Sequence, residues 1–410
     1  MEKHVIELTA TASIAITVFG IVFCLTQTRH LDVGRSFAAF LAAVTANNIP
    51  EAFAHFLEEI PDAHTQLAEL VIWSPSSLML APLFWIYVHA LTSPRQERFS
   101  HLCRHLFLPA LAALVGMSIW ISAPEAAASL LSDAPLPSSV WQTVVVLVYV
   151  SLQLVIYPQL ALYLFLTISR MTNYRIVLRD YYSSTEKHEL RWIYVIGGLS
   201  CSFWLALTFL LFFAFDPDQF DALSTLTSFS SLVGLALVAA ITLWGIRHRP
   251  ALASGHEIEG QPATKADLSS NQPSEKYEKS ALDPEASARI AHKLRTAMET
   301  DRLHRNPNLS LWALARHIGA SPNYISQTLN EVIGESFFDF VNGYRVAEAM
   351  TRLSQTNDTV LAITYDVGFN ARSSFYNAFK RVTGQTPSAY RKEMSLREGM
   401  DDISRSMQES

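Results

Sequence analysis

LSLWALARHIGASPNYISQTLNEVIGESFFDFVNGYRVAEA, residues 309–349, and VLAITYDVGFNARSSFYNAFKRVTGQTPSAYRK, residues 360–392, repeat one pattern at an offset of 49 to 50 residues. In each copy a short segment of helical periodicity is followed by a glycine and then by a second periodic segment. A helix, a tight turn and a second helix, present twice, predict two helix-turn-helix units. The positions that correspond are Leu314, Ala315, Ile318 and Gly319 with Ile363, Thr364, Val367 and Gly368, and Ile325, Leu329 and Gly334 with Phe375, Phe379 and Gly384.

The two stretches resemble the DNA-binding domain of the AraC/XylS family of bacterial transcription regulators. The motifs GF, SSFYNAFK and G-x-TP-x-x-YR in the second stretch are the most diagnostic. The resemblance extends over residues 283–394 and implies seven helices, with a long helix around 337–353 between the two units. It also implies double-stranded DNA as a partner, while RNA polymerase and a second copy of the chain are further candidates. Thr364, where the family usually has Ala, affects only local packing.

The second helix of each unit supplies the candidate DNA contacts. In the first unit we expect Ser321 to cap the helix and Pro322 to begin it, with Ile325 and Leu329 facing the core. The outward side carries short amides and hydroxyls, which suit base edges and phosphates. The candidates there are Pro322, Asn323, Ser326, Gln327 and Asn330.

In the second unit Phe375, Phe379 and Val382 are expected to pack inward. The positions left outward match the DNA-contacting positions of the family motif, and a solvated polar face is the alternative interpretation. Arg345 and Arg391 are left open between phosphate contacts and internal salt bridges. The outward candidates are Arg372, Ser373, Tyr376, Asn377 and Lys380.

The charge of this domain is nearly balanced. Residues 283–394 carry 13 basic and 11 acidic groups, which is less positive than many DNA-binding domains. We therefore expect dimerisation to contribute to affinity, because two domains double the length of DNA that is contacted.

Residues 250–282 are rich in Ser, Glu, Lys, Pro, Ala and Gln, and Tyr277 is their only aromatic residue, so we expect a flexible linker. Asp283-Pro284-Glu285 has the pattern of a capped helix start. The helix that follows should bury one face, formed by Ile290, Leu294, Ala297 and Met298. Residues 395–410 are expected to form a polar tail.

The first part of the chain has a different composition. The whole chain has 410 residues, of which 50% are hydrophobic, and a net charge of −6. Residues 1–250 hold 30 charged residues and residues 251–410 hold 38. Three cysteines are too few for a disulfide scaffold. Seven successive apolar segments are each long enough to cross a bilayer: 5–26, 36–57, 70–92, 102–122, 139–168, 193–215 and 223–246. Their number and length disfavour two alternatives, a cleaved signal peptide and a water-soluble helical core.

Charges between these segments alternate in sign, which predicts the orientation, because cytoplasmic loops are enriched in Lys and Arg. Basic residues follow the first, third, fifth and seventh segments, and acidic residues occupy the other loops. Seven spans would place the amino end outside and residue 247 onward in the cytoplasm. The basic residues are Arg29, Arg35, Arg95, Arg98, Arg104, Arg170, Arg175, Arg179, Lys187, Arg191, Arg247 and Arg249.

Polar residues within the second segment form a candidate ligand cavity, since ionisable groups within a span are costly. Asn47, Glu51 and His55 share one helical stripe, and Asn48 lies beside them. Hydrogen bonding between helices is the alternative explanation. His101 and His105 are interpreted as an interfacial face, and no metal site, cofactor or enzyme motif is predicted.

The sequence thus predicts an all-α protein: a seven-helix membrane domain at 1–249, a linker at 250–282 and a double helix-turn-helix domain at 283–394. The preferred function is a transcription regulator in the bacterial inner membrane that responds to a ligand, a lipid or membrane stress. A transporter or membrane enzyme with a DNA-binding appendage, and a passive membrane anchor for the regulator, are the alternatives.

Overall fold

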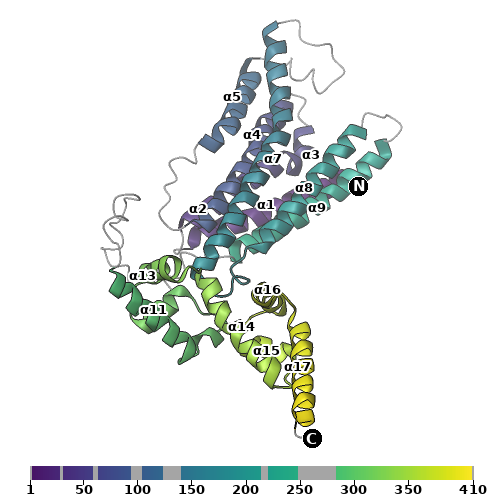
Figure 1. The fold of residues 1–410 in the computed structure, drawn as a ribbon. Coiled ribbons are helices and arrows are strands. Elements are labelled where there is room, and N and C mark those ends of the chain that lie inside the picture. Colours follow the sequence, from purple (N-terminus) through teal and green to yellow (C-terminus); the bar gives the residue numbers. More distant parts are fainter. Residues whose placement is uncertain are drawn as a thin grey trace. The chain divides into compact units, whose positions relative to one another are not determined.

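The computed structural model describes residues 2–27, 31–58, 63–93, 104–122, 140–213, 220–247 and 283–408 (Figure 1). Within these ranges the secondary structure is helical apart from one isolated β-bridge, which confirms the all-α prediction. The residues of the expected linker, 250–282, lie outside the described part. The chain divides into unit one, residues 1–172 and 190–250, and unit two, residues 173–189 and 251–410.

Unit one consists of long apolar helices. Of the seven membrane spans predicted from the sequence, the segments 36–57 and 193–215 do not meet the length and hydropathy expected of a span within the described residues. Five stretches are long and apolar enough to cross a membrane: Lys3–Thr26, Val71–Thr92, Arg104–Ile121, Leu154–Tyr181 and Thr227–Arg247. The helices are α1 (Glu2–Thr26), α2 (Leu31–Ala52), α3 (Ala54–Glu58), α4 (Ala63–Thr92), α5 (Phe107–Ser122), α7 (Val140–Tyr181), α8 (Arg191–Phe213) and α9 (Phe220–Arg247).

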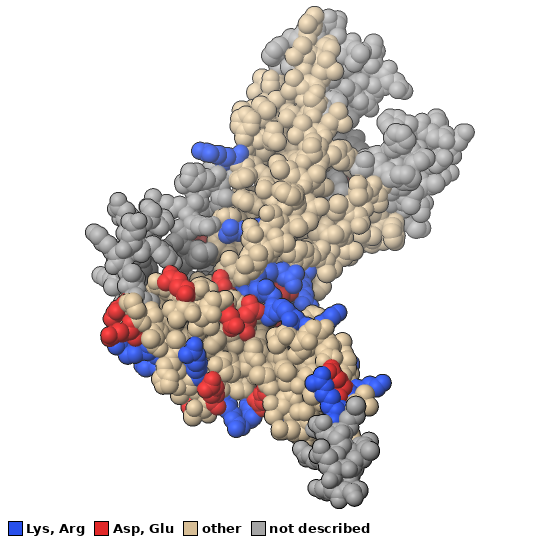
Figure 2. Space-filling model, in the orientation of Figure 1, with Lys and Arg blue, Asp and Glu red and all other residues tan. Residues whose placement is uncertain are grey.

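The polarity of unit one is the reverse of that of a water-soluble bundle. Large apolar side chains such as Leu8, Leu114 and Phe165 are about 70% exposed, while Thr17 is fully buried and within 2.8 Å of the hydroxyl of Thr45. Figure 2 shows the visible face of this unit almost free of Lys, Arg, Asp and Glu. A surface of this kind is suited to contact with hydrocarbon.

Unit two contains a helical domain with two cores. The first core is built on Leu294, Leu314, Ile325 and Phe337, and the second on Leu353, Ile363, Phe375 and Phe379. Helix α14 supplies both, so it joins the two halves. The helices are α11 (Pro284–Glu299), η3 (Leu303–Arg305), α12 (Leu311–Ile318), α13 (Pro322–Gln327) with its π-helical continuation η4 (Thr328–Ile333), α14 (Phe337–Gln355), α15 (Val360–Asp366), α16 (Arg372–Thr383) and α17 (Pro387–Gln408).

The internal repeat is confirmed in the backbone. Gly319 and Gly368 follow α12 and α15, while Gly334 and Gly384 end the second helix of each unit, and all four have positive φ angles. Glycine adopts this conformation without a Cβ clash, which explains why the chain turns at these points. Helix α17 runs to Gln408 and so includes residues that the sequence assigned to a polar tail.

Helix α11 begins and packs as predicted. The Asp283 side chain accepts a hydrogen bond from Glu285 N, and Pro284 is the first helical residue. Leu294, Ala297 and Met298 are almost completely buried, and Ile290 packs against the same core. The apolar stripe therefore fixes α11 against the first helix-turn-helix unit.

Candidate nucleic-acid interface

Helix α13 presents the first set of candidate contacts. The Ser321 side chain caps it by accepting a hydrogen bond from Tyr324 N at 3.3 Å, and Pro322 is its first residue, both as predicted. Ile325 and Leu329 are buried against the core, also as predicted. Of the candidates, Asn323 and Asn330 are exposed, and Pro322, Ser326 and Gln327 are half-buried.

Two of these polar side chains are already engaged along the helix. Gln327 Nε2 donates to Glu331 Oε2 at 2.9 Å, and Asn330 Nδ2 lies 3.5 Å from Ser326 Oγ. Tyr324, which the sequence analysis did not single out, is 42% exposed next to Asn323. Its position just outside the apolar stripe of a short capped helix could have identified Tyr324 as an exposed aromatic residue beside the candidate contacts.

Helix α16 presents the second set. Arg372, Ser373, Asn377 and Lys380 are exposed. Tyr376 is half-buried, and its hydroxyl lies 3.1 Å from Arg372 Nη2 and 3.5 Å from Ser388 Oγ. Hydrogen bonds from Ser388 and Arg372 hold the pKa of the Tyr376 phenol below its usual value. The Arg372 guanidinium also lies over the Tyr376 ring at 4.9 Å, which orients it along the exposed face.

One prediction for α16 is wrong. Val382 was expected to pack inward with Phe375 and Phe379, but its side chain is 54% exposed. It lies in the last turn of the helix, beyond the second core, and Ala378 completes the buried face. The apolar stripe therefore ends one turn before the helix does.

Helix α16 carries two exposed cations among its candidate DNA contacts, Arg372 and Lys380. Several other cations of the domain are paired with acids: Arg305 with Glu348, Arg352 with Asp366 and Arg381 with Asp339. Within residues 283–408, Arg372 and Lys380 form no ion pair, so both charges are available to a phosphate backbone. Figure 2 shows acidic and basic side chains interspersed on the visible face of unit two.

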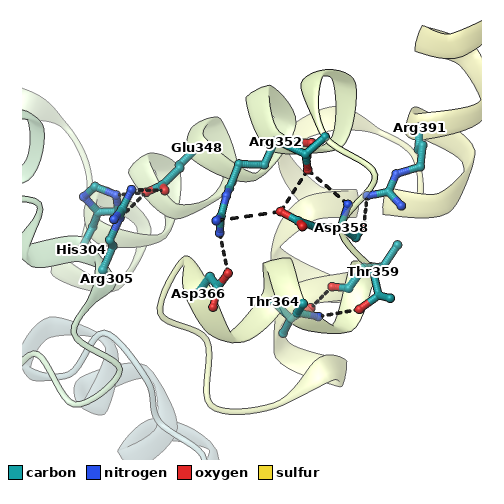
Figure 3. A network of polar contacts seen from close by, with 12 residues as sticks. His304, Arg305, Glu348, Arg352, Asp358, Thr359, Thr364, Asp366 and Arg391 are labelled. Atoms are coloured by element: carbon teal, nitrogen blue, oxygen red, sulfur yellow. Dashed lines mark hydrogen bonds and ion pairs between the residues drawn. The ribbon is translucent and has the colours of Figure 1, made fainter.

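A polar network centred on α14 holds the two helix-turn-helix units together (Figure 3). Glu348 Oε2 lies 2.7 Å from His304 Nε2 and accepts from Arg305 Nε at 3.0 Å. One turn further along α14, Arg352 Nη1 donates to Asp366 at the end of α15 at 2.8 Å. These contacts tie the chain before α12 and the helix α15 to the same element, which limits their relative movement.

The network predicts an acid-dependent loss of stability. Burial of the Glu348 carboxyl opposes ionisation, but hydrogen bonds from Arg305 and His304 outweigh it and lower its pKa. A carboxyl whose pKa is lower in the folded chain than in the unfolded chain stabilises the fold at any pH above the unfolded pKa. That stability is lost as the pH falls through the folded pKa. We expect Glu348→Gln to lower the unfolding free energy by about 1 kcal/mol at pH 7, measured by denaturant titration of the purified chain. The difference from the unmodified chain should shrink below pH 4.5, the ordinary value of this group, and a difference independent of pH contradicts the assignment.

Neither of the two ambiguous arginines is free for phosphate. Arg345 is completely buried, and the residues that its guanidinium hydrogen-bonds are Ser183, Ser184, His304, Asn306 and Asn342. Arg391 Nη2 donates to the backbone oxygen of Asp358 at 2.6 Å. Both side chains therefore make internal hydrogen bonds rather than carboxylate ion pairs.

The polar stripe at residues 47–55, on α2 and α3, includes a contact between α2 and α4. Ser77 Oγ of α4 donates to Asn47 Oδ1 at 3.1 Å, and Asn48 Nδ2 donates to Val44 O of its own helix at 2.8 Å. Glu51 and His55 are exposed. The Asn47 contact matches the alternative of interhelical hydrogen bonding, and a ligand cavity at these residues stays a prediction.

Comparison with known proteins identifies the C-terminal helices. Residues 314–393 match the family described as a helix-turn-helix domain. An uncharacterized HTH-type transcriptional regulator of Staphylococcus aureus (strain COL) is 36% identical over 89 residues, which are 22% of this chain and 12% of that protein. The HTH-type transcriptional regulator GlxA of Rhizobium meliloti (strain 1021) is 32% identical over 103 residues, which are 25% of this chain and 30% of that protein.

The chain thus spans less than a third of the length of these relatives. A solved structure, the C-terminal domain of AraT, a response regulator from Geobacillus stearothermophilus, is 24% identical with a TM-score of 0.24, and the match covers 28% of this chain and 88% of that one. The sequence matches show that the C-terminal part carries an AraC-type helix-turn-helix domain shared with transcriptional regulators.

Proposed function

We propose that this chain is a one-component transcription regulator embedded in the bacterial inner membrane. Unit one lies in the bilayer and responds to a small ligand, a lipid or membrane stress, and the helix-turn-helix domain binds promoter DNA in the cytoplasm. The observation that carries the proposal is the exposed face of α16. There two cations that form no ion pair with the described residues lie with an amide on a helix-turn-helix domain shared with transcriptional regulators. Helices of this kind read base edges in the major groove.

The membrane orientation has support from the contacts of residues 173–189. This segment comprises the end of the span Leu154–Tyr181 and the turn after it, and it carries the basic residues Arg175, Arg179 and Lys187. It belongs to the same unit as the helix-turn-helix domain. Residues that pack together must lie on one side of a bilayer. The basic loop and the DNA-binding domain therefore share a side, as the positive-inside rule requires of a cytoplasmic domain. With α2 and α8 counted as further spans, the amino end lies outside.

A transporter or enzyme with a DNA-binding appendage would need its chemistry within unit one, where the stripe Asn47, Asn48, Glu51 and His55 is the candidate. A passive anchor would need no chemistry there. Regulation that survives replacement of these four residues by apolar ones identifies the anchor. Regulation that is lost, with protein level unchanged, assigns the stripe to signal sensing or transport.

Selection from a random duplex library tests DNA recognition directly. We expect the full-length chain in detergent to enrich one sequence from duplexes of about 40 base pairs, a length that covers several major-groove turns of about 10 base pairs each. Failure to enrich any sequence above a matched beads-only control contradicts the proposed function.

The charge of Lys380 should be visible in the salt dependence of binding to the selected duplex. Each lysine that contacts a phosphate releases counterions, so Lys380→Ala should weaken binding and reduce the slope of log K against log salt by about 1. Asn323→Ala should weaken binding to the selected sequence without changing the slope, because an amide displaces no cation. Equal slopes for Lys380→Ala and the unmodified chain remove Lys380 from the interface.

A further inference from the structure

Residues 173–189, at the end of α7 and in the turn after it, have a fixed local structure. His188 N and Glu189 N donate to Thr185 O at 2.9 and 2.8 Å, and Thr185 Oγ1 donates to Glu189 Oε1 at 2.9 Å. The rings of Tyr182 and His188 stack with centroids 3.9 Å apart. The segment therefore presents Ser183 and Ser184 from an ordered turn.

This turn supplies acceptors to the buried guanidinium of Arg345 in α14. Arg345 donates to Ser183 O at 3.1 Å, to Ser183 Oγ at 3.0 Å and to Ser184 Oγ at 3.4 Å. Its other three hydrogen bonds go to His304 O, Asn306 O and Asn342 Oδ1 within the helix-turn-helix domain. A buried cation is costly unless acceptors surround it, and the turn provides half of the hydrogen bonds.

Electrostatics favour the same pairing. Burial lowers the pKa of Arg345 to about 10, so the side chain remains charged at neutral pH, and the negative charge of Glu186 acts in the opposite direction. Glu186 belongs to the segment. The segment thus brings both the acceptors and a compensating charge to the guanidinium.

Backbone, side-chain and aromatic contacts surround this centre. Ser183 N donates to Leu309 O at 3.1 Å, and Lys187 Nζ donates to Asn308 Oδ1 at 2.9 Å. The ring of Tyr181 stacks on Trp312 with centroids 5.0 Å apart and an angle of 15°. An aromatic anchor beside a desolvated polar centre is the pattern of an energetically important interface.

We propose that residues 173–189 are a docking segment, whose partner is the surface of the DNA-binding domain formed by Arg345, Trp312 and residues 306–310. Through it, the end of α7 holds the domain at the membrane independently of the 250–282 linker. The inference rests on the proposed function only in requiring that both pieces face the cytoplasm.

The docking surface is separate from the candidate DNA contacts. The hydrogen bonds and ring contacts of the segment described above fall on α14, on α12 and on the residues before α12, whereas the DNA contacts lie on the exposed faces of α13 and α16. At the edge, the ring of Phe338 is covered by Arg179 of the segment at 5.0 Å and by Arg381 of α16 at 5.6 Å. These hydrogen bonds and ring contacts of the segment therefore involve none of the candidate DNA contacts on α13 and α16.

A disulfide tests the docking in the full-length chain. Tyr182 and Ser310 oppose each other in an antiparallel β-bridge. The neighbouring hydrogen bond from Ser183 N to Leu309 O shows that they form a non-hydrogen-bonded pair, the type in which the two Cα atoms are closer together. Such pairs have Cα atoms about 4.5 Å apart, which suits a disulfide. The variant carries Tyr182→Cys and Ser310→Cys, with the native cysteines replaced by Ser and a protease site in the linker. Membranes are oxidised and cut, and the two fragments are separated without reductant.

We expect most of the C-terminal fragment to stay joined to the N-terminal fragment. The control variant carries Tyr182→Cys and Ser395→Cys, and its yield measures the collisions that the linker alone allows. The docked pair should exceed that yield by at least about tenfold. A second pair, Lys187→Cys with Asn308→Cys joined by a short bismaleimide, changes only exposed side chains. Tyr181→Ala should lower the yield of that pair several-fold, and Ile176→Ala, an exposed control, should not.

Yields at the control level for both pairs overturn the docking segment. The duplex selection separates this outcome from a failure of the proposed function. Cross-linking lost with selection intact overturns docking alone, and selection lost with cross-linking intact overturns DNA recognition alone.

Discussion

Replacing Arg372 and Asn377 together by Ala should abolish specific DNA occupancy in cells while the protein remains in the membrane at its normal level. Both side chains are exposed on α16, as is that of Lys380. A good side-chain contact to a base contributes about 1–3 kcal/mol of discrimination. Loss of two such contacts, about 2–6 kcal/mol in total, therefore weakens specific binding by roughly thirtyfold to ten-thousandfold. The measurement is genome-wide footprinting of the variant against the unmodified chain.

The matched control for this variant is Arg397→Ala. Arg397 is an exposed cation on α17 that pairs with Glu393 at 2.6 Å, so its loss changes the net charge in the same way without touching a recognition helix. The control should keep its footprints. If the double variant keeps them as well, α16 is not the recognition helix. The genes that lie under the lost footprints would indicate which signal unit one detects.

Gly368→Ala should prevent the helix-turn-helix domain from folding, whereas Gly319→Ala should be tolerated. Gly368 has a φ of 99°, and a Cβ there would lie 2.5 Å from His304 O and 2.8 Å from the backbone of Arg305. Backbone atoms cannot move aside cheaply, and His304 O also accepts the hydrogen bond of Arg345 Nε at 2.7 Å. We expect a cost above about 3 kcal/mol, a large share of ordinary domain stability.

Gly319 is the equivalent glycine of the first repeat and isolates the effect of the backbone angle. Its φ is 65°, and a Cβ there would meet no atom within 4 Å. Alanine in this conformation costs about 1–2 kcal/mol. Limited proteolysis of membranes, followed with a carboxyl-terminal tag, should show a degraded domain for Gly368→Ala and a protected one for Gly319→Ala. Equal protection of the two variants contradicts the close approach of the Gly368 turn to residues 304–305.

Local patterns were sufficient to predict most of the C-terminal domain. The cap at Ser321, the glycine turns and the buried positions Ile325, Leu329, Phe375 and Phe379 follow from periodicity and from residue chemistry within one or two turns. The prediction that Val382 is buried was wrong, because periodicity does not show where the neighbouring core ends. The sequence therefore identified the candidate DNA-binding face, although it misjudged its edge.

The role of Arg345 and of residues 173–189 could not be predicted in this way. Ser183 and Arg345 are 162 residues apart, and no local period connects them. One signal was present, since Arg345 occupies a stripe of α14 whose other members at four-residue spacing, Phe337, Val341 and Ala349, are buried. A cation in such a stripe indicates a buried charge that needs acceptors. It does not indicate which part of the chain provides them.

Reporter fusions test most directly whether a membrane-embedded chain presents its DNA-binding domain to the cytoplasm. Alkaline phosphatase is active only on the outer side of the cytoplasmic membrane. Green fluorescent protein fluoresces when it stays in the cytoplasm and does not fluoresce when the general secretory route exports it. We expect fusions after residue 249 to fluoresce and to lack phosphatase activity, and fusions after Asp62, in an acidic loop, to show the reverse. Phosphatase activity after residue 249 would place the helix-turn-helix domain outside the cell's interior, where it cannot reach the chromosome, and would contradict the account.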